Sequence, residues 1–292
     1  MAGAGVPERS EPGISLPRAG WVRRLRGLPV VSLAILTVVI AFTLAAEWIA
    51  PFDPNGQNLS RFLQPPGAVH LMGTDALGRD IFSRIVHGSR ITLLVGLASV
   101  TLAGSVGFTL GMLSAVLRPA IGEAIMRLTD TVLALPAVLI ALAVAATVGP
   151  SLVNVILIIG FLYWAHFARM VRAEALAIRD MDFVQAALAL GCSQTRLVLV
   201  HLAPNLINTV IVVGTLQIAS AILLESTLSF LGVGVPPPAA TWGTMVAEAR
   251  PYIALAWWTV TFPGLAIMAT VLATNLLGDR LRDALDPRLQ WR

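Results

Sequence analysis

The sequence contains no lysine and a single cysteine. All 20 basic residues are arginines, which excludes chemistry that depends on a lysine side chain, such as a Walker A phosphate loop, a Schiff base or a lysine general base. Cys192 has no partner for an internal disulfide, and no Cys/His spacing is typical of a metal site. No cofactor is therefore expected in this chain itself, and the fold must depend on helix packing.

Charge of either sign is also scarce. Only 12% of the 292 residues are charged and 57% are hydrophobic, whereas about a quarter of the residues of an average soluble domain are charged. The mean hydropathy is +0.81. This composition predicts an all-α polytopic membrane protein that is surrounded by a lipid bilayer and has no nucleic-acid partner.

Long uncharged runs predict six transmembrane helices. A helix needs about 20 apolar residues to cross a hydrocarbon core of ~30 Å. Gly149-Pro150-Ser151 divides one run that is too long for a single helix, and Pro263 predicts a kink in the last span. The predicted spans are residues 28–50, 91–117, 131–148, 151–168, 206–224 and 252–278.

The segments outside the spans complete the predicted organisation. Residues 1–27 are rich in Gly, Pro, Ser and Arg, which is typical of a disordered tail. Residues 51–90 are predicted to form an external loop. Residues 91–278 are predicted to form a five-helix core that includes a cytoplasmic loop at 173–205, and residues 279–292 a cytoplasmic tail.

The distribution of arginine predicts the orientation in the membrane. With six spans both termini lie on one side, and fifteen of the 20 arginines fall on that side. Five lie on the other side, at Arg61, Arg79, Arg84, Arg90 and Arg250. The positive-inside rule therefore predicts that both termini are cytoplasmic.

The second predicted span contains glycines at Gly107 and Gly111. This GxxxG spacing lets two helix backbones approach closely. Packing inside the chain's own helix bundle is the favoured interpretation, and a dimer contact is the alternative.

The segment 183–205 is a polar-flanked loop with a helical pattern. Phe183, Ala187 and Leu190 fall on one face of a short helix, Gly191 permits a change of direction, and a second helix is predicted at about 195–202. Pro204 suits the first turn of the next span. The pattern predicts two surface helices that dock onto another protein, and the alternative is a loop that only lies on lipid.

This loop resembles the signature of the inner-membrane permease subunits of ABC importers, in the peptide/nickel group. The family pattern is Glu-Ala-Ala, three residues and Gly, with a later Leu-Pro. Here it stands as Gln185-Ala186-Ala187, then Gly191, and ends in Ala203-Pro204. Gln185 replaces the usual glutamate, so an ionic contact with a partner is replaced by neutral hydrogen bonding.

The resemblance extends over most of residues 70–290. It covers a Gly-Thr-Asp-x-x-Gly-Arg-Asp signature of the second ("C") permease, the stretch 225–234 with Trp242-Gly243, and the stretch 279–287. The residues of the external-loop signature are Gly73, Thr74, Asp75, Gly78, Arg79 and Asp80.

The resemblance implies a type I importer fold and a non-catalytic subunit in a bacterial inner membrane. It implies a translocation path shared with a second homologous permease, ATPase subunits that bind ATP and Mg²⁺, and an extracellular or periplasmic solute-binding protein. Dipeptides, oligopeptides, nickel chelates and haem all remain open as substrates. The implied ATPase-coupling residues are Phe183, Gln185, Ala186, Ala187, Leu190, Gly191, Arg196 and Pro204.

The sequence disfavours two other classes of protein. A secondary transporter driven by an ion gradient would usually carry carboxylates in the middle of its spans, and these spans are uncharged there. An intramembrane enzyme would need a motif such as Gly-x-Ser-x-Gly or His-Glu-x-x-His, and neither occurs in the sequence.

For each of two groups of polar residues, two interpretations remain open. Glu225, with Ser229, either binds the amino terminus of a transported peptide or anchors a turn by hydrogen bonds, and the anchor is favoured. Asp75, Arg79 and Asp80 either face the binding protein or form a salt-bridge network within the external loop.

Overall fold

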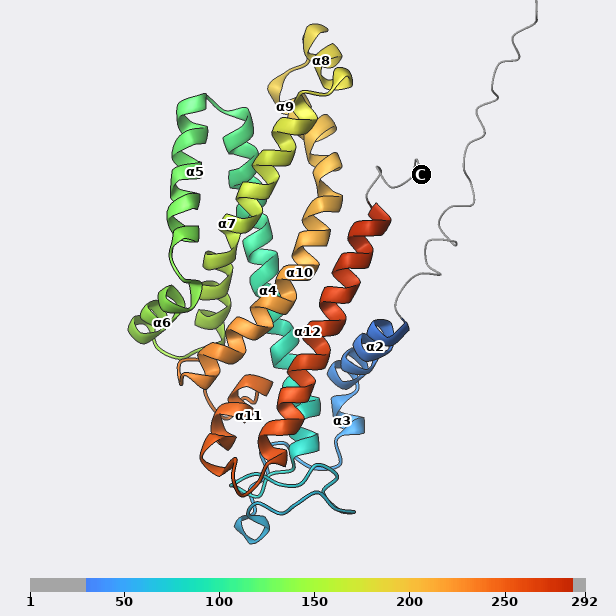
Figure 1. Ribbon diagram of the computed structural model, residues 1–292, viewed down its shortest axis with the longest axis vertical. Helices are drawn as coiled ribbons and strands as arrows, with labels where there is room; N and C mark the ends of the chain where they lie inside the picture. Colours follow the sequence, from blue (N-terminus) through green and yellow to red (C-terminus); the bar gives the residue numbers. More distant parts are fainter. Residues whose placement is uncertain (1–29, 286–292) are drawn as a thin grey trace, which may run out of the picture.

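A computed structural model describes residues 30–285, and every regular element among them is helical (Figure 1). Short 3₁₀ turns occur at Leu59–Arg61 and Arg250–Tyr252, and a π-helix at Leu197–Leu202. The α-helices are α2 (Val30–Leu44), α3 (Ala46–Ile49), α4 (Ile81–Val116), α5 (Pro119–Ala134), α6 (Ala137–Val148), α7 (Leu152–Arg179), α8 (Asp182–Ala189), α9 (Gln194–Arg196), α10 (Ala203–Phe230), α11 (Trp242–Ala249) and α12 (Trp258–Leu285).

Apolar helices occupy all six places at which a span was predicted. Four are long enough to cross a membrane, namely α4, α7, the continuous run 194–230 and α12, and the bent pair α5 and α6 adds a fifth. The first is α2, which has 15 residues and breaks at Ala45 before α3. At 1.5 Å per residue α2 is only about 22 Å long. The first two residues of the predicted span 28–50 lie outside the described residues.

The second span begins ten residues earlier than predicted. Asp80 is the N-cap of α4, and its carboxylate accepts a hydrogen bond from the backbone N–H of Ser83 at 2.8 Å. The helix therefore starts at Ile81 and contains Arg84 and Arg90, which had suggested a loop. The predicted loop boundary at residue 90 is wrong, because the side chain of Arg84 is paired and buried within the protein.

The third span differs from its prediction at both ends. Residues 119–130 lie outside the predicted spans, but they form most of α5, whose charged residues Glu123, Arg127 and Asp130 share one exposed side. The helix stops before Pro136, because a proline in the helix interior removes a hydrogen bond and clashes with the preceding turn. Helix α6 then leaves at 89° to α5, so the predicted span 131–148 is divided by a bend, with its first residues in α5 and the rest in α6.

Helices also extend into the predicted cytoplasmic segments. Helix α7 continues to Arg179, and the run 194–230 is one helix whose π-helical segment precedes Pro204. The predicted second short helix at 195–202 is therefore the start of the fifth span. The loop predicted at 173–205 shortens to residues 180–193. Helix α12 continues to Leu285, so the predicted tail 279–292 begins later. The predicted tail 1–27 and residues 286–292 lie outside the described residues.

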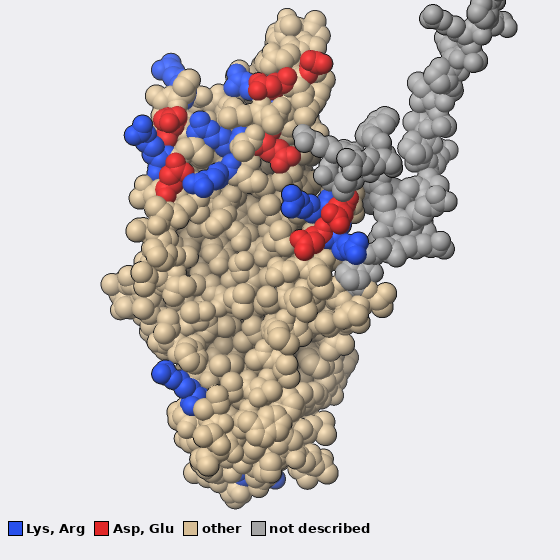
Figure 2. Space-filling model, in the orientation of Figure 1, with Lys and Arg blue, Asp and Glu red and all other residues tan. Residues whose placement is uncertain are grey.

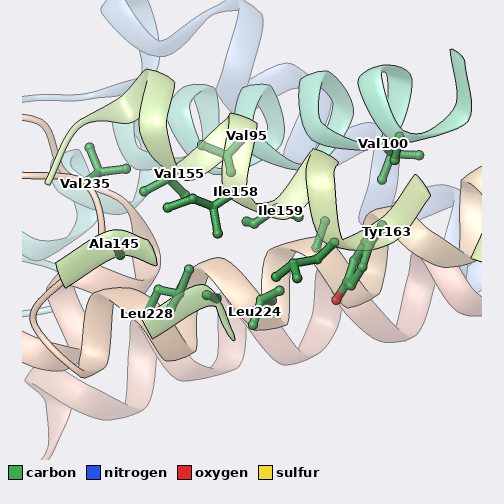
Figure 3. Close-up of a cluster of buried hydrophobic side chains, with 14 of the residues drawn as sticks. Val95, Val100, Ala145, Val155, Ile158, Ile159, Tyr163, Leu224, Leu228 and Val235 are labelled. Atoms are coloured by element: carbon green, nitrogen blue, oxygen red, sulfur yellow. The ribbon is translucent and has the colours of Figure 1, made fainter. Parts of the chain in front are cut away.

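The centre of the bundle is the contact between α4 and α7. A Cβ atom on Gly107 would lie 2.4 Å from the carbonyl oxygen of Trp164, and one on Gly111 would lie 2.6 Å from that of Ala168. The GxxxG pair therefore packs inside the bundle, which confirms the favoured interpretation. Side chains of α4, α6, α7 and α10 meet beside this contact in the largest hydrophobic cluster (Figure 3).

Charged residues are concentrated toward one end of the molecule. Figure 2 shows Arg, Asp and Glu gathered around the end that carries α5, α8 and the last turns of α12, with a broad uncharged belt beside it. The segment 51–80 and α11 lie at the other end, and α6 lies between the two ends (Figure 1). This separation is the one expected for a protein whose belt contacts hydrocarbon.

Candidate functional site

The external-loop signature forms a tight turn at the start of α4. Gly78 has a φ of +70°, and a Cβ atom there would lie 1.8 Å from the carbonyl oxygen of Asn58, so only glycine fits. The Asp75 carboxylate closes the turn by accepting hydrogen bonds from the backbone N–H groups of Leu77 and Arg79, at 2.8 and 2.9 Å. The turn therefore directs the side chains of Asp75 and Arg79 into the protein.

These side chains belong to an ionic ring of four residues, Asp75, Arg79, Arg84 and Glu248. Oδ2 of Asp75 lies 2.6 Å from Nε of Arg79 and 2.6 Å from Nη1 of Arg84. Oε2 of Glu248 lies 2.6 Å from Nη2 of Arg79 and 2.8 Å from Nη1 of Arg84. The two arginine side chains are only 8% and 3% exposed. Two positive and two negative charges therefore neutralise one another, and the ring joins α11 to the start of α4.

The other signature residues are also held within the fold. Asp80 bonds Nδ1 of His70 at 2.8 Å through one oxygen and the N–H and hydroxyl of Ser83 through the other. Thr74 is buried, and its carbonyl oxygen accepts a hydrogen bond from the indole of Trp258 at 3.2 Å. Gly73 leaves room for that indole, since a Cβ atom would lie 2.7 Å from its nitrogen. The structure thus shows the salt-bridge network and not an exposed charged surface.

Sequence reasoning missed three members of this network. Glu248 lies 164 residues after Arg84 and on α11, a helix that no hydrophobic pattern indicated. Arg84 was assigned to a loop, and no role was predicted for His70. The signal that could have found Arg84 is the spacing of Asp80 as an N-cap before an apolar run. No signal in the sequence pairs Glu248 with it.

Glu225 is completely buried and serves as a hydrogen-bonded anchor. Its Oε1 accepts hydrogen bonds from the hydroxyls of Ser229 and Thr241, both at 2.7 Å. Thr241 is also the N-cap of α11 and forms a capping box with Thr244. The carboxylate therefore fixes the position at which α11 begins against the end of α10. This geometry favours the anchor over a site for a peptide amino terminus.

Substitutions of Glu225 distinguish an anchor role from a site for a peptide amino terminus. Glu225→Gln keeps an oxygen acceptor for the hydroxyls of Ser229 and Thr241, so we expect the free energy of unfolding to change by less than about 1 kcal/mol and transport to be retained. Glu225→Leu leaves both hydroxyls without this acceptor and is expected to cost about 2 kcal/mol. Thermal unfolding in detergent and uptake measure the two effects. Loss of transport in a normally folded Glu225→Gln would instead indicate direct contact with the substrate.

The predicted coupling residues lie at the charged end of the bundle, where α8 projects beyond the other helices (Figure 1). Phe183 is 48% exposed and Leu190 is 90% exposed, whereas Val184 is buried against Leu197 and Leu202. Ala186 is exposed and Ala187 is half-buried. Helix α8 therefore packs on the start of the fifth span and presents apolar side chains outward.

The remaining coupling residues lie around α8. Gly191 is exposed, with a φ of +82° and no atom within 4 Å of its missing Cβ, so its role is to reverse the chain direction. Arg196 and Pro204 are exposed. Nε2 of Gln185 donates a hydrogen bond to the carbonyl oxygen of Arg179 at 2.9 Å. A glutamate could not donate this bond, so the amide at position 185 fastens α8 to the end of α7.

The bundle has an uncharged belt, and α8 projects from its charged end. At the other end, the external loop is held by the ionic ring. This arrangement is that of a multi-pass membrane transport subunit. Residues 107–291 match the family of binding-protein-dependent transport system inner membrane components, and residues 24–66 match the N-terminal TM domain of oligopeptide transport permease C. The chain therefore belongs to the binding-protein-dependent transport system inner membrane components.

Curated relatives cover nearly the whole chain. The di/tripeptide transport system permease protein DppC of Pseudomonas aeruginosa is 44% identical over 88% of this chain and 87% of its own length. The probable D,D-dipeptide transport system permease protein DdpC of Escherichia coli is 41% identical over 92% and 90%. The dipeptide transport system permease protein DppC of Escherichia coli is 41% identical over 92% of both chains.

A solved structure shares the fold. A chain of the MetNI methionine ABC transporter, in an inward-facing conformation, superposes with a TM-score of 0.58 at 18% identity. The match covers 69% of this chain and 95% of that chain. The fold is therefore that of the type I ABC importer permeases, as the resemblance implied.

Proposed function

We propose that this chain is the permease subunit of an ATP-driven importer of short peptides. The observation that carries the proposal is the 41–44% identity to dipeptide and tripeptide permeases along about nine-tenths of the chain. The test is uptake of radiolabelled di-, tri- and tetra-alanine by vesicles that contain the whole transporter. ATP-dependent accumulation supports the proposal. Accumulation that persists without ATP and follows an ion gradient would favour the secondary transporter.

The proposed assembly has a second homologous permease, ATPase subunits that bind ATP and Mg²⁺, and a solute-binding protein on the external side. In this assembly the side chains of Phe183 and Leu190 insert into the ATPase subunit. Their exposure supports this role, because large apolar side chains that project beyond the bundle into water are most stable when a partner covers them. Closure of the ATPase subunits would then move α8, and with it α7 and α10.

The proposed orientation places α8 in the cytoplasm. Fifteen of the 20 arginines then lie inside. The ionic ring explains why two external arginines are tolerated, since Arg79 and Arg84 are neutralised by Asp75 and Glu248. Cys192 is partly exposed beside α8 and gives the test. We expect a membrane-impermeant thiol reagent to label Cys192 in inside-out vesicles and to miss it in intact cells, and the reverse pattern would invert the topology.

Replacing Gly191 tests the coupling role of α8. Gly191→Val forces a β-branched residue into a positive φ, which strains the turn by about 1–3 kcal/mol and shifts α8. We expect less ATPase subunit to co-purify and transport to fall at least about tenfold, since 1.4 kcal/mol corresponds to a factor of ten. The amount of ATPase subunit bound per permease is measured on purified complexes.

Gly149→Val is the matched control for this experiment. Gly149 also has a positive φ, of +87°, and no atom within 4 Å of its missing Cβ, but it lies between α6 and α7, at the opposite end of α7 from α8. We expect this variant to retain its ATPase subunits. Equal loss in both variants would show that the effect is on folding and not on coupling.

A further inference from the structure

One side of α7 changes its environment half-way along the helix. Positions 158, 162, 166, 169 and 173 follow at intervals of four, four, three and four, so they lie along one side of the helix. Ile158 and Leu162 are buried in the hydrophobic core, at 6% and 3% exposure (Figure 3 labels Ile158). On the same side, toward the end of α7 that leads to α8, His166, Arg169 and Ala173 are exposed.

This exposed half of the stripe faces a hollow of about 420 Å³ between α5 and α7. Its lining residues are Leu133 of α5 and His166, Arg169, Met170 and Ala173 of α7. Arg169 pairs with Asp130 of α5 across the hollow's rim, at 2.6 Å, and both side chains are more than half exposed. The lining of the hollow therefore carries an imidazole and a guanidinium group, and the carboxylate of Asp130 is paired with the latter.

Two polar side chains, one on α7 and one on α10, have no hydrogen-bond partner among residues 30–285. His166 makes a ring contact with Tyr163, at 5.9 Å between centroids, and lies near the charge of Arg169, but it makes no hydrogen bond. Gln217 of α10 makes no hydrogen bond in the described part of the chain. The hydroxyl of Tyr163 donates to the carbonyl oxygen of Ser220 at 3.1 Å, which ties α7 to α10 three residues before His166 and three residues after Gln217. A ring nitrogen and an amide without partners are costly against hydrocarbon, so this side of the bundle must face water or a polar solute.

An adjoining side of α7 has the opposite character. Leu157 and Phe161 are exposed there, and together with Ile158 and Leu162 of the first side they line a groove of about 580 Å³ formed with α4, α5 and α6. Of the fourteen residues that line this groove, thirteen are apolar and one, Asn154, is polar. That surface suits lipid chains or an apolar helix. One side of α7 is therefore suited to contact water or a polar solute, and the other is suited to contact an apolar surface.

We propose that the hollow at His166, together with Gln217, is this chain's wall of the solute path. The proposal rests on the function proposed above and deepens it by naming the residues that the solute passes. A short peptide carries both hydrogen-bond donors and acceptors and a charge at each end. The imidazole of His166 and the amide of Gln217 each donate and accept, and the Arg169–Asp130 pair offers one charge of each sign, so the wall suits such a solute.

Cysteine accessibility tests the proposal in the whole transporter, in a Cys192→Ser background. A charged thiol reagent modifies the thiolate, which forms in water and not in hydrocarbon. We expect His166→Cys and Gln217→Cys in inside-out vesicles to react at least about tenfold faster than the control Leu157→Cys, because only the first two contact water. This readout needs no knowledge of the substrate.

A second readout identifies the solute. Tri-alanine is expected to slow the modification of His166→Cys, and the modified protein is expected to lose uptake while still hydrolysing ATP. Equal reactivity at His166→Cys and Leu157→Cys, or a modified His166→Cys that transports normally, would overturn the proposed wall. If the wall reacts with the reagent but no peptide protects it, the peptide substrate is contradicted and the aqueous path stands.

Discussion

Arg84→Met is expected to lower the free energy of unfolding by about 3 kcal/mol, because removing one member of a buried ion pair leaves a charge without its partner. Arg84 is 3% exposed and its Nη1 bonds both Asp75 and Glu248. After its removal, two carboxylates compete for Arg79. Unfolding in increasing denaturant, in detergent, measures the change.

Arg90→Met is the matched control on the same helix. Arg90 is 37% exposed, and its ion pair with Glu47 is longer, at 3.3 Å, with a glutamate that is 76% exposed. The Nε of Arg90 also donates a hydrogen bond to the carbonyl oxygen of Thr43 at 2.7 Å. An exposed pair contributes about 0–1 kcal/mol and a hydrogen bond about 1 kcal/mol, so we expect a loss of about 1 kcal/mol, well below that at Arg84. A loss at Arg90 as large as that at Arg84 would contradict the assignment of the stabilisation to the ionic ring.

The ring also predicts non-additive effects. Once Arg84 is replaced by methionine, Asp75→Asn removes the charge that has lost a partner. The double variant Asp75→Asn/Arg84→Met is therefore expected to lose less stability than the sum of the two single variants, by about 1 kcal/mol or more. Strict additivity would mean that the two side chains act independently.

Gly107→Leu is expected to prevent close packing of α4 on α7, with a loss of at least about 3 kcal/mol. A Cβ atom at this position would lie 2.4 Å from the backbone oxygen of Trp164 and 2.5 Å from the Cβ of Phe167. Backbone atoms cannot rotate away, so the two helices must separate along the central contact of the bundle. The expected observation is loss of the folded protein from detergent extracts, measured by size-exclusion chromatography.

Alanine variants make this comparison quantitative. Gly107→Ala is expected to cost about 1–3 kcal/mol, because even one methyl group overlaps α7. Gly104→Ala, one turn earlier on α4, adds a Cβ atom that lies 3.7 Å from the Phe167 ring, which is an ordinary contact. Alanine also favours helix by about 1 kcal/mol over glycine, so Gly104→Ala should be neutral or stabilising. Destabilisation by Gly104→Ala would contradict the packing described for α4.

The ends of helices could be predicted from the sequence only where a local signal, such as glycine or proline, marks them. The helix break at Gly149-Pro150 was predicted, since glycine and proline act through their own backbone. Helix α5 was missed because its three charged residues lie on one exposed side, and an uncharged-run criterion discards any helix with a polar face. Arg84 was misplaced for a related reason, because a run of sequence does not show that a charge will be neutralised by a residue far along the chain.

In the candidate site around α8, too, local features could be predicted from the sequence and contacts between helices could not. The pattern of Phe183, Ala187 and Leu190 predicted a short helix with an apolar face, and α8 is present there, while its contact with an ATPase subunit remains a prediction. Gln185 was considered only as a partner-facing side chain. Its bond to the carbonyl oxygen of Arg179 depends on how α7 ends, which no local pattern specifies.

The sequence by itself determined the membrane class, the places of the six apolar helices and the resemblance to importer permeases, because hydrophobicity and motif spacing are local properties. Tertiary structure decided the ionic ring, the anchoring of α11 by Glu225 and the two contrasting sides of α7. Each of these depends on side chains from different helices that meet within hydrogen-bond or contact distance. Whether a polar residue is buried, paired or open to a solute path depends on its neighbours in space, and the bundle supplies those neighbours.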